Sequence, residues 1–383
     1  MPSIIKIGSI DKRLILPIQF ALSTIIINLF GTNNKFKNYS HPIIDLFTKS
    51  IGKMLIIIIP NIKKYSFIQD RIFSKKKFVL NFIILIMAYL IFYLLLIFCD
   101  NALKQKQDYR DIFKLSLISG LCSQDSFLII FITLFTKFIL KYNYFIHNII
   151  SIICFVIISI LIDIILNPID IETDFELIIF IFFAIFLLTT YAFIITYLKY
   201  FMDKLYFTPY NLAFITGISV LLLNIIFVIA FFNGLTIKDI NIIKSFSDYF
   251  NGINIFYFIL IIILNIFLNF LNELFQMLTI YYLTPNHLLI SYIIIKLITI
   301  FFKNNNTFPF LKLIALILQF FILMIYLEVL ELNFCNLNKN TKKNILEREK
   351  KEMNPINEGL DSNIISNNDD DDINGYDDNE KKC

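Results

Sequence analysis

A lysine stands deep inside an apolar stretch of this chain. Lys296 follows Pro285 by eleven residues. At about 1.5 Å of helix rise per residue it lies roughly 16 Å along a helix, near the middle of a hydrocarbon core about 30 Å thick. A cation at that depth is costly when it faces lipid, so we expect Lys296 to face a cavity or a carboxylate. Tyr292 and Thr299 share its face by helical spacing, and the three residues form a polar stripe.

A second polar stripe precedes it. Asn265, Asn269, Asn272 and Gln276 recur at spacings of 4, 3 and 4 along one wall of a helix, with Glu273 beside them. Four amides in hydrocarbon need hydrogen-bond partners. They can bond to neighbouring helices or line a wet pathway, and we favour the pathway. Glu273 supplies the structural alternative for Lys296, a buried salt bridge between the two side chains.

Three further charges occur together near the N-terminus. Asp45, Lys49 and Lys53 follow one another at intervals of four residues and therefore share one helical face. Asp45 and Lys49 can neutralise each other one turn apart, whereas the sequence offers no evident mate for Lys53. Such a face suits contact with protein or water and not with lipid.

The motifs of catalysis are not found in the sequence. The chain has three scattered histidines, no acidic cluster at metal-ligand spacing, no GxSxG and no Walker loop. Five cysteines show no paired spacing. We therefore expect no enzyme, no cofactor and no metal. Its basic stretches adjoin apolar segments, so they give no support for nucleic-acid binding.

The composition indicates a membrane protein. Hydrophobic residues make up 57% of the chain and its mean hydropathy is +0.72. The apolar runs do not alternate with polar residues, which favours helices over a barrel. We predict ten membrane helices, over residues 14–30, 43–62, 78–99, 117–140, 145–166, 175–199, 209–232, 255–280, 285–302 and 309–330.

Charge distribution predicts the orientation. Six basic residues lie between Lys63 and Lys77, between the second and third helices, and basic residues occur again after the tenth. The positive-inside rule then places both termini in the cytoplasm, although four basic residues between Lys104 and Lys114 fall on the opposite side. Residues 336–383 form a charged, Asn-rich tail that we expect to be disordered, following a ten-helix domain over residues 1–335.

The two halves of that domain echo each other. His41-Pro42 opens the second helix with Gly52 ten residues later, and Thr208-Pro209 opens the seventh with Gly217 eight residues later. The offsets favour a duplication of five helices, with halves at about 1–168 and 169–335. Because five is odd, the halves insert with opposite topology, so we predict an all-α protein of two inverted repeats. Such repeats place a substrate site near the midplane between the halves.

Two motifs give the chain a family resemblance. Residues 197–204 read Tyr-Leu-Lys-Tyr-Phe-Met-Asp-Lys and run into Phe207-Thr208-Pro209. Residues 282–287 read Tyr-Leu-Thr-Pro-Asn-His and precede Lys296. With ten helices, these features resemble the drug/metabolite transporter superfamily, in its branch of nucleotide-sugar and triose-phosphate transporters. The resemblance covers about residues 14–332 and implies that Lys296 meets an anionic group of the substrate.

The resemblance implies a secondary-active transporter that works by alternating access, as an exchanger of a small polar or anionic metabolite such as a nucleotide sugar or sugar phosphate. The expected site comprises Lys296, Tyr292, Thr299, Glu273 and the four amides of the second stripe. Expected partners are the small-molecule substrate and the lipid bilayer, and a homodimer is open. We expect an endomembrane location, Golgi or endoplasmic reticulum, with the plasma membrane as alternative. The competing class is a non-transporting scaffold or receptor that keeps a transporter-like fold.

Overall fold

A computed structural model describes residues 5–7, 12–32, 42–59, 75–105, 124–166, 175–232, 255–302 and 310–332. Almost all of these residues are helical, and each of the ten predicted helical ranges overlaps an α-helix. Two short 3-10 helices, η1 (Lys12–Leu14) and η3 (Pro285–His287), precede α1 and α13. The α-helices are α1 (Ile15–Thr32), α3 (Pro42–Leu55), α5 (Lys75–Gln105), α7 (Gln124–Ile139), α8 (Ile146–Leu166), α9 (Phe175–Lys204), α10 (Pro209–Phe232), α12 (Ile255–Tyr282), α13 (Leu288–Phe302) and α14 (Phe310–Tyr326).

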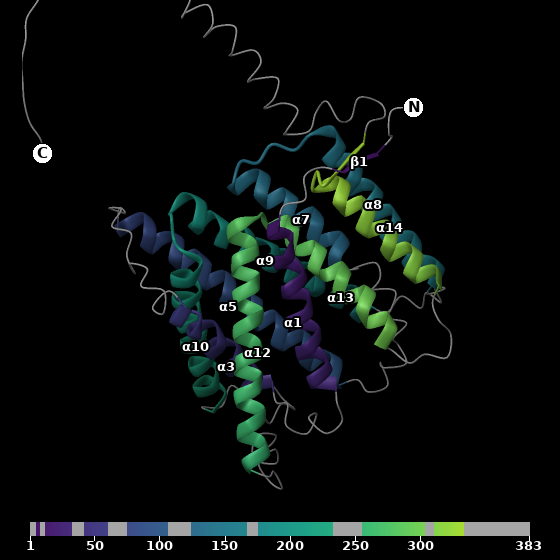
Figure 1. The fold of residues 1–383 in the computed structure, drawn as a ribbon. Coiled ribbons are helices and arrows are strands. Elements are labelled where there is room, and N and C mark those ends of the chain that lie inside the picture. Colours follow the sequence, from purple (N-terminus) through teal and green to yellow (C-terminus); the bar gives the residue numbers. More distant parts are fainter. Residues whose placement is uncertain are drawn as a thin grey trace, which may run out of the picture.

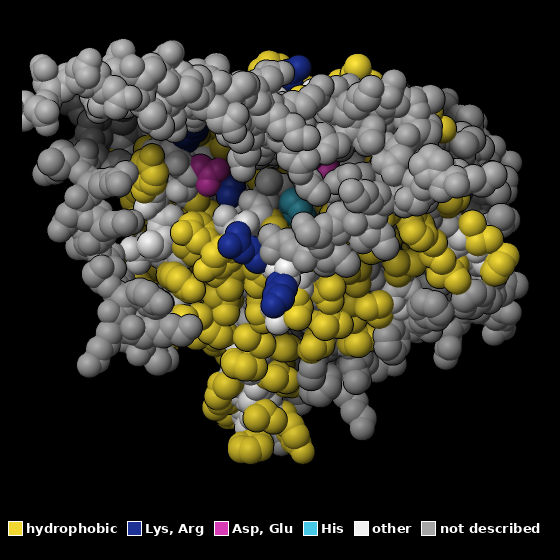
Figure 2. All heavy atoms as spheres, turned by 45° about the horizontal axis from the view of Figure 1, so that its top comes forward, with side chains coloured by type: hydrophobic (Ala, Val, Ile, Leu, Met, Phe, Trp, Pro, Cys, Tyr) yellow, Lys and Arg dark blue, Asp and Glu magenta, His cyan; other side chains and the backbone are white. Residues whose placement is uncertain are grey.

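Five stretches of the described residues are long and apolar enough to cross a membrane: residues 12–29, 78–95, 185–204, 209–229 and 255–282. Shorter apolar helical stretches lie within α7, α8, α13 and α14. Large side chains on these helices point outward, among them Phe182, Ile226 and Ile263, each at least 60% exposed. The charged side chains in Figure 2 gather toward one end, and the surface beneath them is mostly hydrophobic. Such a surface is not tolerated in water and is consistent with a helical membrane protein.

The helices pack in a defined set of pairs. In Figure 1, α1 and α12 lie side by side near the centre, with α3, α5 and α10 to one side and α8, α13 and α14 to the other. The closest pairings are α3 with α10 and α12, α1 with α12 and α13, α9 with α5 and α7, and α8 with α14. Helix α12 therefore packs against two helices from the first half of the chain, α1 and α3.

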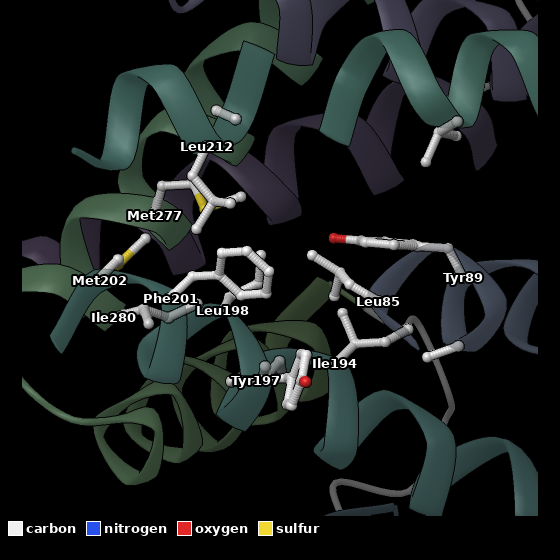
Figure 3. Packing of buried hydrophobic residues seen from close by; sticks show 14 of the residues in the cluster. Leu85, Tyr89, Ile194, Tyr197, Leu198, Phe201, Met202, Leu212, Met277 and Ile280 are labelled. Atoms are coloured by element: carbon white, nitrogen blue, oxygen red, sulfur yellow. The ribbon is translucent and has the colours of Figure 1, made fainter. Parts of the chain in front are cut away.

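A core cluster fills the space between α5, α9, α10 and α12. Figure 3 shows Phe201 of α9 beside Leu212 of α10 and Met277 of α12, and all three are at most 1% exposed. Leu85 of α5 faces Ile194 of α9, and the Tyr89 hydroxyl points from α5 into the same interior. These contacts join helices from both halves of the chain, so the polar groups beside them are held by a packed frame.

The second helix is interrupted within its predicted range. Helix α3 ends at Leu55, and residues 56–57 form a turn in which Ile57 N–H bonds to the Met54 carbonyl at 3.3 Å. The fourteen residues of α3 span only about 20 Å, less than the thickness of a bilayer core. Residues 58–59 are helical again, so the break falls inside the predicted range 43–62, and residues 60–62 lie outside the described residues.

The last helix ends earlier than predicted. Helix α14 stops at Tyr326, and Glu328 adopts a left-handed conformation with φ of 60°. The chain then forms strand β2 (Leu330–Leu332), which pairs antiparallel with strand β1 (Ile5–Ile7). Strand pairing between two segments so far apart has no local signal in the sequence. It joins the segment before α1 to the segment after α14, so both lie at the same end of the bundle (Figure 1).

The two glycines of the sequence echo lie at helix crossings. A Cβ built on Gly52 of α3 would lie 2.8 Å from the backbone nitrogen of Phe270 in α12. One built on Gly217 of α10 would lie 3.0 Å from the backbone nitrogen of Met54 in α3. Both glycines thus let helix backbones approach closely, as small residues do in membrane bundles.

We predict that Gly52→Val destabilises the protein by about 1 to 3 kcal/mol, because the added carbons must push α3 from α12. Thermal unfolding of the purified protein in detergent measures the change. Leu222→Val is the control, since Leu222 is 55% exposed on α10 and its substitution should alter stability by at most about 0.5 kcal/mol. Unchanged stability of Gly52→Val would show that the crossing is not closely packed.

Candidate functional site

The amide stripe of α12 faces other helices. Asn272 Oδ1 accepts hydrogen bonds from the hydroxyls of Ser23 and Thr24 in α1, at 2.9 and 2.8 Å. Asn269 Nδ2 donates to the Asn265 carbonyl at 2.9 Å and to Thr48 Oγ1 of α3 at 3.4 Å. The bonds to Ser23, Thr24 and Thr48 run between helices, which is the less favoured of the two uses expected for the stripe, whereas the bond to Asn265 lies within α12. The bonds between helices tie α12 to α1 and α3.

The upper end of the stripe continues through two tyrosines. Gln276 Nε2 donates to the Tyr191 hydroxyl of α9 at 3.1 Å, and that hydroxyl lies 2.6 Å from the Tyr292 hydroxyl of α13. Tyr191 also stacks on Phe92 of α5. Three polar side chains from three helices therefore meet at one depth, and Tyr292 is a member of the predicted site.

Glu273 pairs with Lys53. The Lys53 Nζ lies 3.1 Å from Glu273 Oε2, and the two side chains are 9% and 17% exposed. The ammonium also donates to the Tyr89 hydroxyl at 3.2 Å and lies 5.1 Å from the centre of that ring. Lys53 is the cation for which the sequence offered no mate, and the structure supplies it from a helix 220 residues away.

The predicted salt bridge between Glu273 and Lys296 has a competitor in this arrangement. Lys296 and Tyr292 are both half-buried on α13. Counting from the level where Gln276 and Tyr292 meet, Glu273 lies about 4.5 Å deeper along α12 and Lys296 about 6 Å deeper along α13. Because Lys53 contacts Glu273, Lys53 and Lys296 occur at similar depth. Thr299 belongs to α13, and its side chain lies outside the described residues.

Many serine and threonine hydroxyls in the helices bond to a carbonyl of their own helix. Thr216 of α10 and Thr279 of α12, for example, donate to carbonyls four residues earlier, at 2.8 and 2.7 Å. A hydroxyl satisfied in this way needs no partner across the bundle. Lys53, Asn272 and Gln276 of the central network differ, because their side chains contact side chains of other helices.

Sequence reasoning missed several members of this network. Tyr89, Tyr191 and the hydroxyl residues of α1 were not singled out, although tyrosine in an otherwise apolar run was a usable signal. Thr48 lies one turn before Gly52, where α3 crosses α12. A tyrosine or threonine in a membrane helix is common enough that spacing alone does not mark it.

A second polar cluster closes the end of the bundle that carries β1 and β2. His147 Nε2 of α8 lies 3.1 Å from Glu328 Oε1, and Asn148 Nδ2 donates to the Tyr326 carbonyl at 2.8 Å. Asn286 Nδ2 donates to the Tyr144 hydroxyl at 3.0 Å. These bonds hold the ends of α14 and α13 against the turn between α7 and α8.

Basic side chains gather at the same end. Arg13 lies over the Tyr282 ring at 5.4 Å, and Lys199 Nζ lies 3.1 Å from Asp203 Oδ1 and 2.9 Å from the Tyr281 carbonyl. The Tyr142 hydroxyl donates to Asp203 at 3.4 Å. Burial and the nearby Asp203 carboxylate raise the pKa of Tyr142, so it stays a donor at neutral pH. Further basic residues near these contacts are Lys12, Lys137, Lys141 and Lys204.

Comparison of the sequence with models of known protein families finds no match, and comparison with curated proteins finds none either.

Proposed function

We propose that this protein is a secondary-active transporter for a small polar or anionic metabolite. The observation that carries the proposal is the polar network at mid-depth, to which helices from both halves contribute. Glu273, Gln276 and Asn272 of α12 contact α3, α9 and α1 respectively. Polar and charged groups at such depth are costly, and in membrane proteins they mark substrate or ion pathways.

The broken helix α3 supports the proposal. Lys53 lies in its last turn, two residues before the end at Leu55. Transporter sites near the midplane are commonly built at discontinuous helices, because the interrupted backbone offers polar groups to a ligand. The negative end of the helix dipole also favours a cation at this position.

The helix pairings support an inverted repeat. If the halves are exchanged, α1 takes the place of α9, α3 of α10, α5 of α12, α7 of α13 and α8 of α14. The pair α1 with α12 then becomes α9 with α5, and α7 with α9 becomes α13 with α1, all of which are close pairings. The pairs α3 with α10 and α8 with α14 map onto themselves. Rocking of one half against the other is the motion that such symmetry favours.

We place both termini in the cytoplasm of a membrane crossed ten times. The pairing of β1 with β2 supports an even number of crossings, and the basic side chains around Arg13 and Lys199 gather at that same end. A tag after Leu332 that a non-cytoplasmic protease cleaves in intact vesicles would contradict this orientation. The predicted tail, residues 336–383, lies outside the described residues.

The proposal is tested with the full-length protein in liposomes, screened for uptake and counterflow of nucleotide sugars, sugar phosphates and cationic drugs. We expect protein-dependent movement of one chemical class, with saturation and with inhibition by members of the same class. Liposomes without protein are the control. Absence of transport for every class would favour the alternative of a scaffold with a transporter-like fold.

A further inference from the structure

The buried pair between Lys53 and Glu273 is held by few bonds. Glu273 Oε2 is buried and faces the ammonium at 3.1 Å, yet it accepts no hydrogen bond of normal geometry from any described residue. A carboxylate normally accepts several hydrogen bonds when it leaves water. An ion pair is favourable at depth only when further bonds satisfy its lone pairs and protons. Glu273 Oε2 is therefore held mainly by the charge of the Lys53 ammonium, so another anion can replace it at that ammonium.

The cation is fixed more firmly than its partner. The Tyr89 hydroxyl and ring hold Lys53 from the α5 side, and Gly52 beside it packs against α12. Glu273 is the more exposed of the two charged side chains, at 17% against 9%. A ligand that approaches the pair from the side of the more exposed Glu273 therefore meets the carboxylate first and can displace it from Lys53.

Displacement has an electrostatic condition. Leaving either charge unpaired at this depth is strongly unfavourable, so Lys53 must receive an anion and Glu273 must lose its charge. We propose that an anionic group of the substrate replaces the Glu273 carboxylate at Lys53, and that Glu273 takes up one proton as it is displaced. The proton comes from the aqueous side and forms an O–H bond on the carboxylate, and no bond in the substrate breaks. The net charge of the site is unchanged when the arriving group carries one negative charge.

This inference rests on the proposed transport function and adds a coupling ion to it. With the substrate gone, Glu273 releases its proton and again neutralises Lys53, so the empty site carries no unpaired charge. The empty protein can then change its conformation without substrate. The transporter can therefore move an anion together with a proton in one direction, as well as exchange one anion for another. The resemblance described above implies exchange and does not indicate a coupling ion.

Other titratable groups surround the pair. Helix α5 contributes Tyr89 and Tyr93, which interact electrostatically with Lys53. Helix α9 contributes Tyr191, which interacts with Glu273, and α13 contributes Tyr292 and Lys296. Helix α1, which packs along α12, carries no charged residue, and α10 carries only Tyr210 among titratable types. Helix α3 itself carries Asp45 and Lys49, eight and four residues before Lys53. Glu273 is the one acid among the groups named here from the other helices, and the tyrosines are neutral at physiological pH.

The test measures proton uptake when an anion binds to the full-length protein in detergent. The probes are UDP-glucose, gluconate and sulfate, whose charges do not change between about pH 6 and about pH 8. Calorimetry in buffers of different ionisation enthalpy counts protons. For a binding probe we expect about one proton per anion, and a Kd that rises about tenfold for each unit of pH.

Two substitutions and a matched control complete the test. Glu273→Gln should bind the same anion without proton uptake and with a Kd that changes less than about twofold over this pH range. Lys53→Met should lose binding. Asp203→Asn makes the same carboxylate-to-amide exchange in the pair with Lys199 and should behave as the wild type. If Glu273→Gln does not fold, infrared difference spectra of the wild type should show a protonated carboxyl band when the anion binds.

Several results would overturn the inference: no binding of any probe to the wild type, binding without proton uptake, proton uptake that persists in Glu273→Gln, or no carboxyl band. Failure here is distinct from failure of the proposed function. Uptake of a neutral substrate in liposomes without anion binding would retain transport and reject the proton site. Anion binding with proton uptake but no transport would retain the site and reject transport.

Discussion

Replacement of Lys296 by alanine is expected to abolish uptake in proteoliposomes while the protein remains folded. Lys296 is half-buried on α13, one turn beyond the Tyr292 hydroxyl that joins the central network. Removal of one partner from a buried charge contact costs about 2 to 5 kcal/mol, which corresponds to more than tenfold in affinity for an anionic substrate. Initial uptake rates at several substrate concentrations measure the loss.

Lys137→Ala is the matched control, since Lys137 is exposed in the last turn of α7. Its uptake should remain within about twofold of the wild type, because surface charges contribute little. A different outcome would contradict the binding role of Lys296. If Lys296→Met lowers thermal stability strongly and Glu273→Gln restores it, Lys296 belongs to a structural ion pair.

Removal of Lys53 is expected to produce the largest loss of stability. Lys53→Met leaves the Glu273 carboxylate without its cation inside the bundle, and breaking a buried pair in this way costs about 3 to 5 kcal/mol. Replacing both partners by neutral groups of similar shape is much less costly. The double variant Lys53→Met/Glu273→Gln should therefore recover most of the stability.

Thermal unfolding in detergent of the wild type, both single variants and the double variant forms a complete mutant cycle. Lys137→Met, at an exposed site, should change stability by no more than about 0.5 kcal/mol. Additive effects of the two central substitutions would show that Lys53 and Glu273 do not interact. The same cycle measured with Lys296→Met in place of Lys53→Met tests which lysine the carboxylate depends on.

The sequence by itself determined the helical segments and their membrane character. Continuous apolar runs at about 20 residues need no knowledge of neighbours, because a helix satisfies its own backbone groups in lipid. For α10 the predicted and observed bounds are both Pro209–Phe232. The spacing of Asn265, Asn269, Asn272 and Gln276 likewise revealed a polar face, since helical periodicity is a local property.

Only the tertiary structure decided what those polar residues touch. Lys53 and Glu273 are separated by 220 positions, and their 3.1 Å contact depends on the crossing of α3 and α12 at Gly52. The pairing of β1 with β2 is likewise a contact between distant segments. The physical reason is that hydropathy records how each residue interacts with lipid or water, whereas ion pairs and hydrogen bonds between helices depend on which helices pack together.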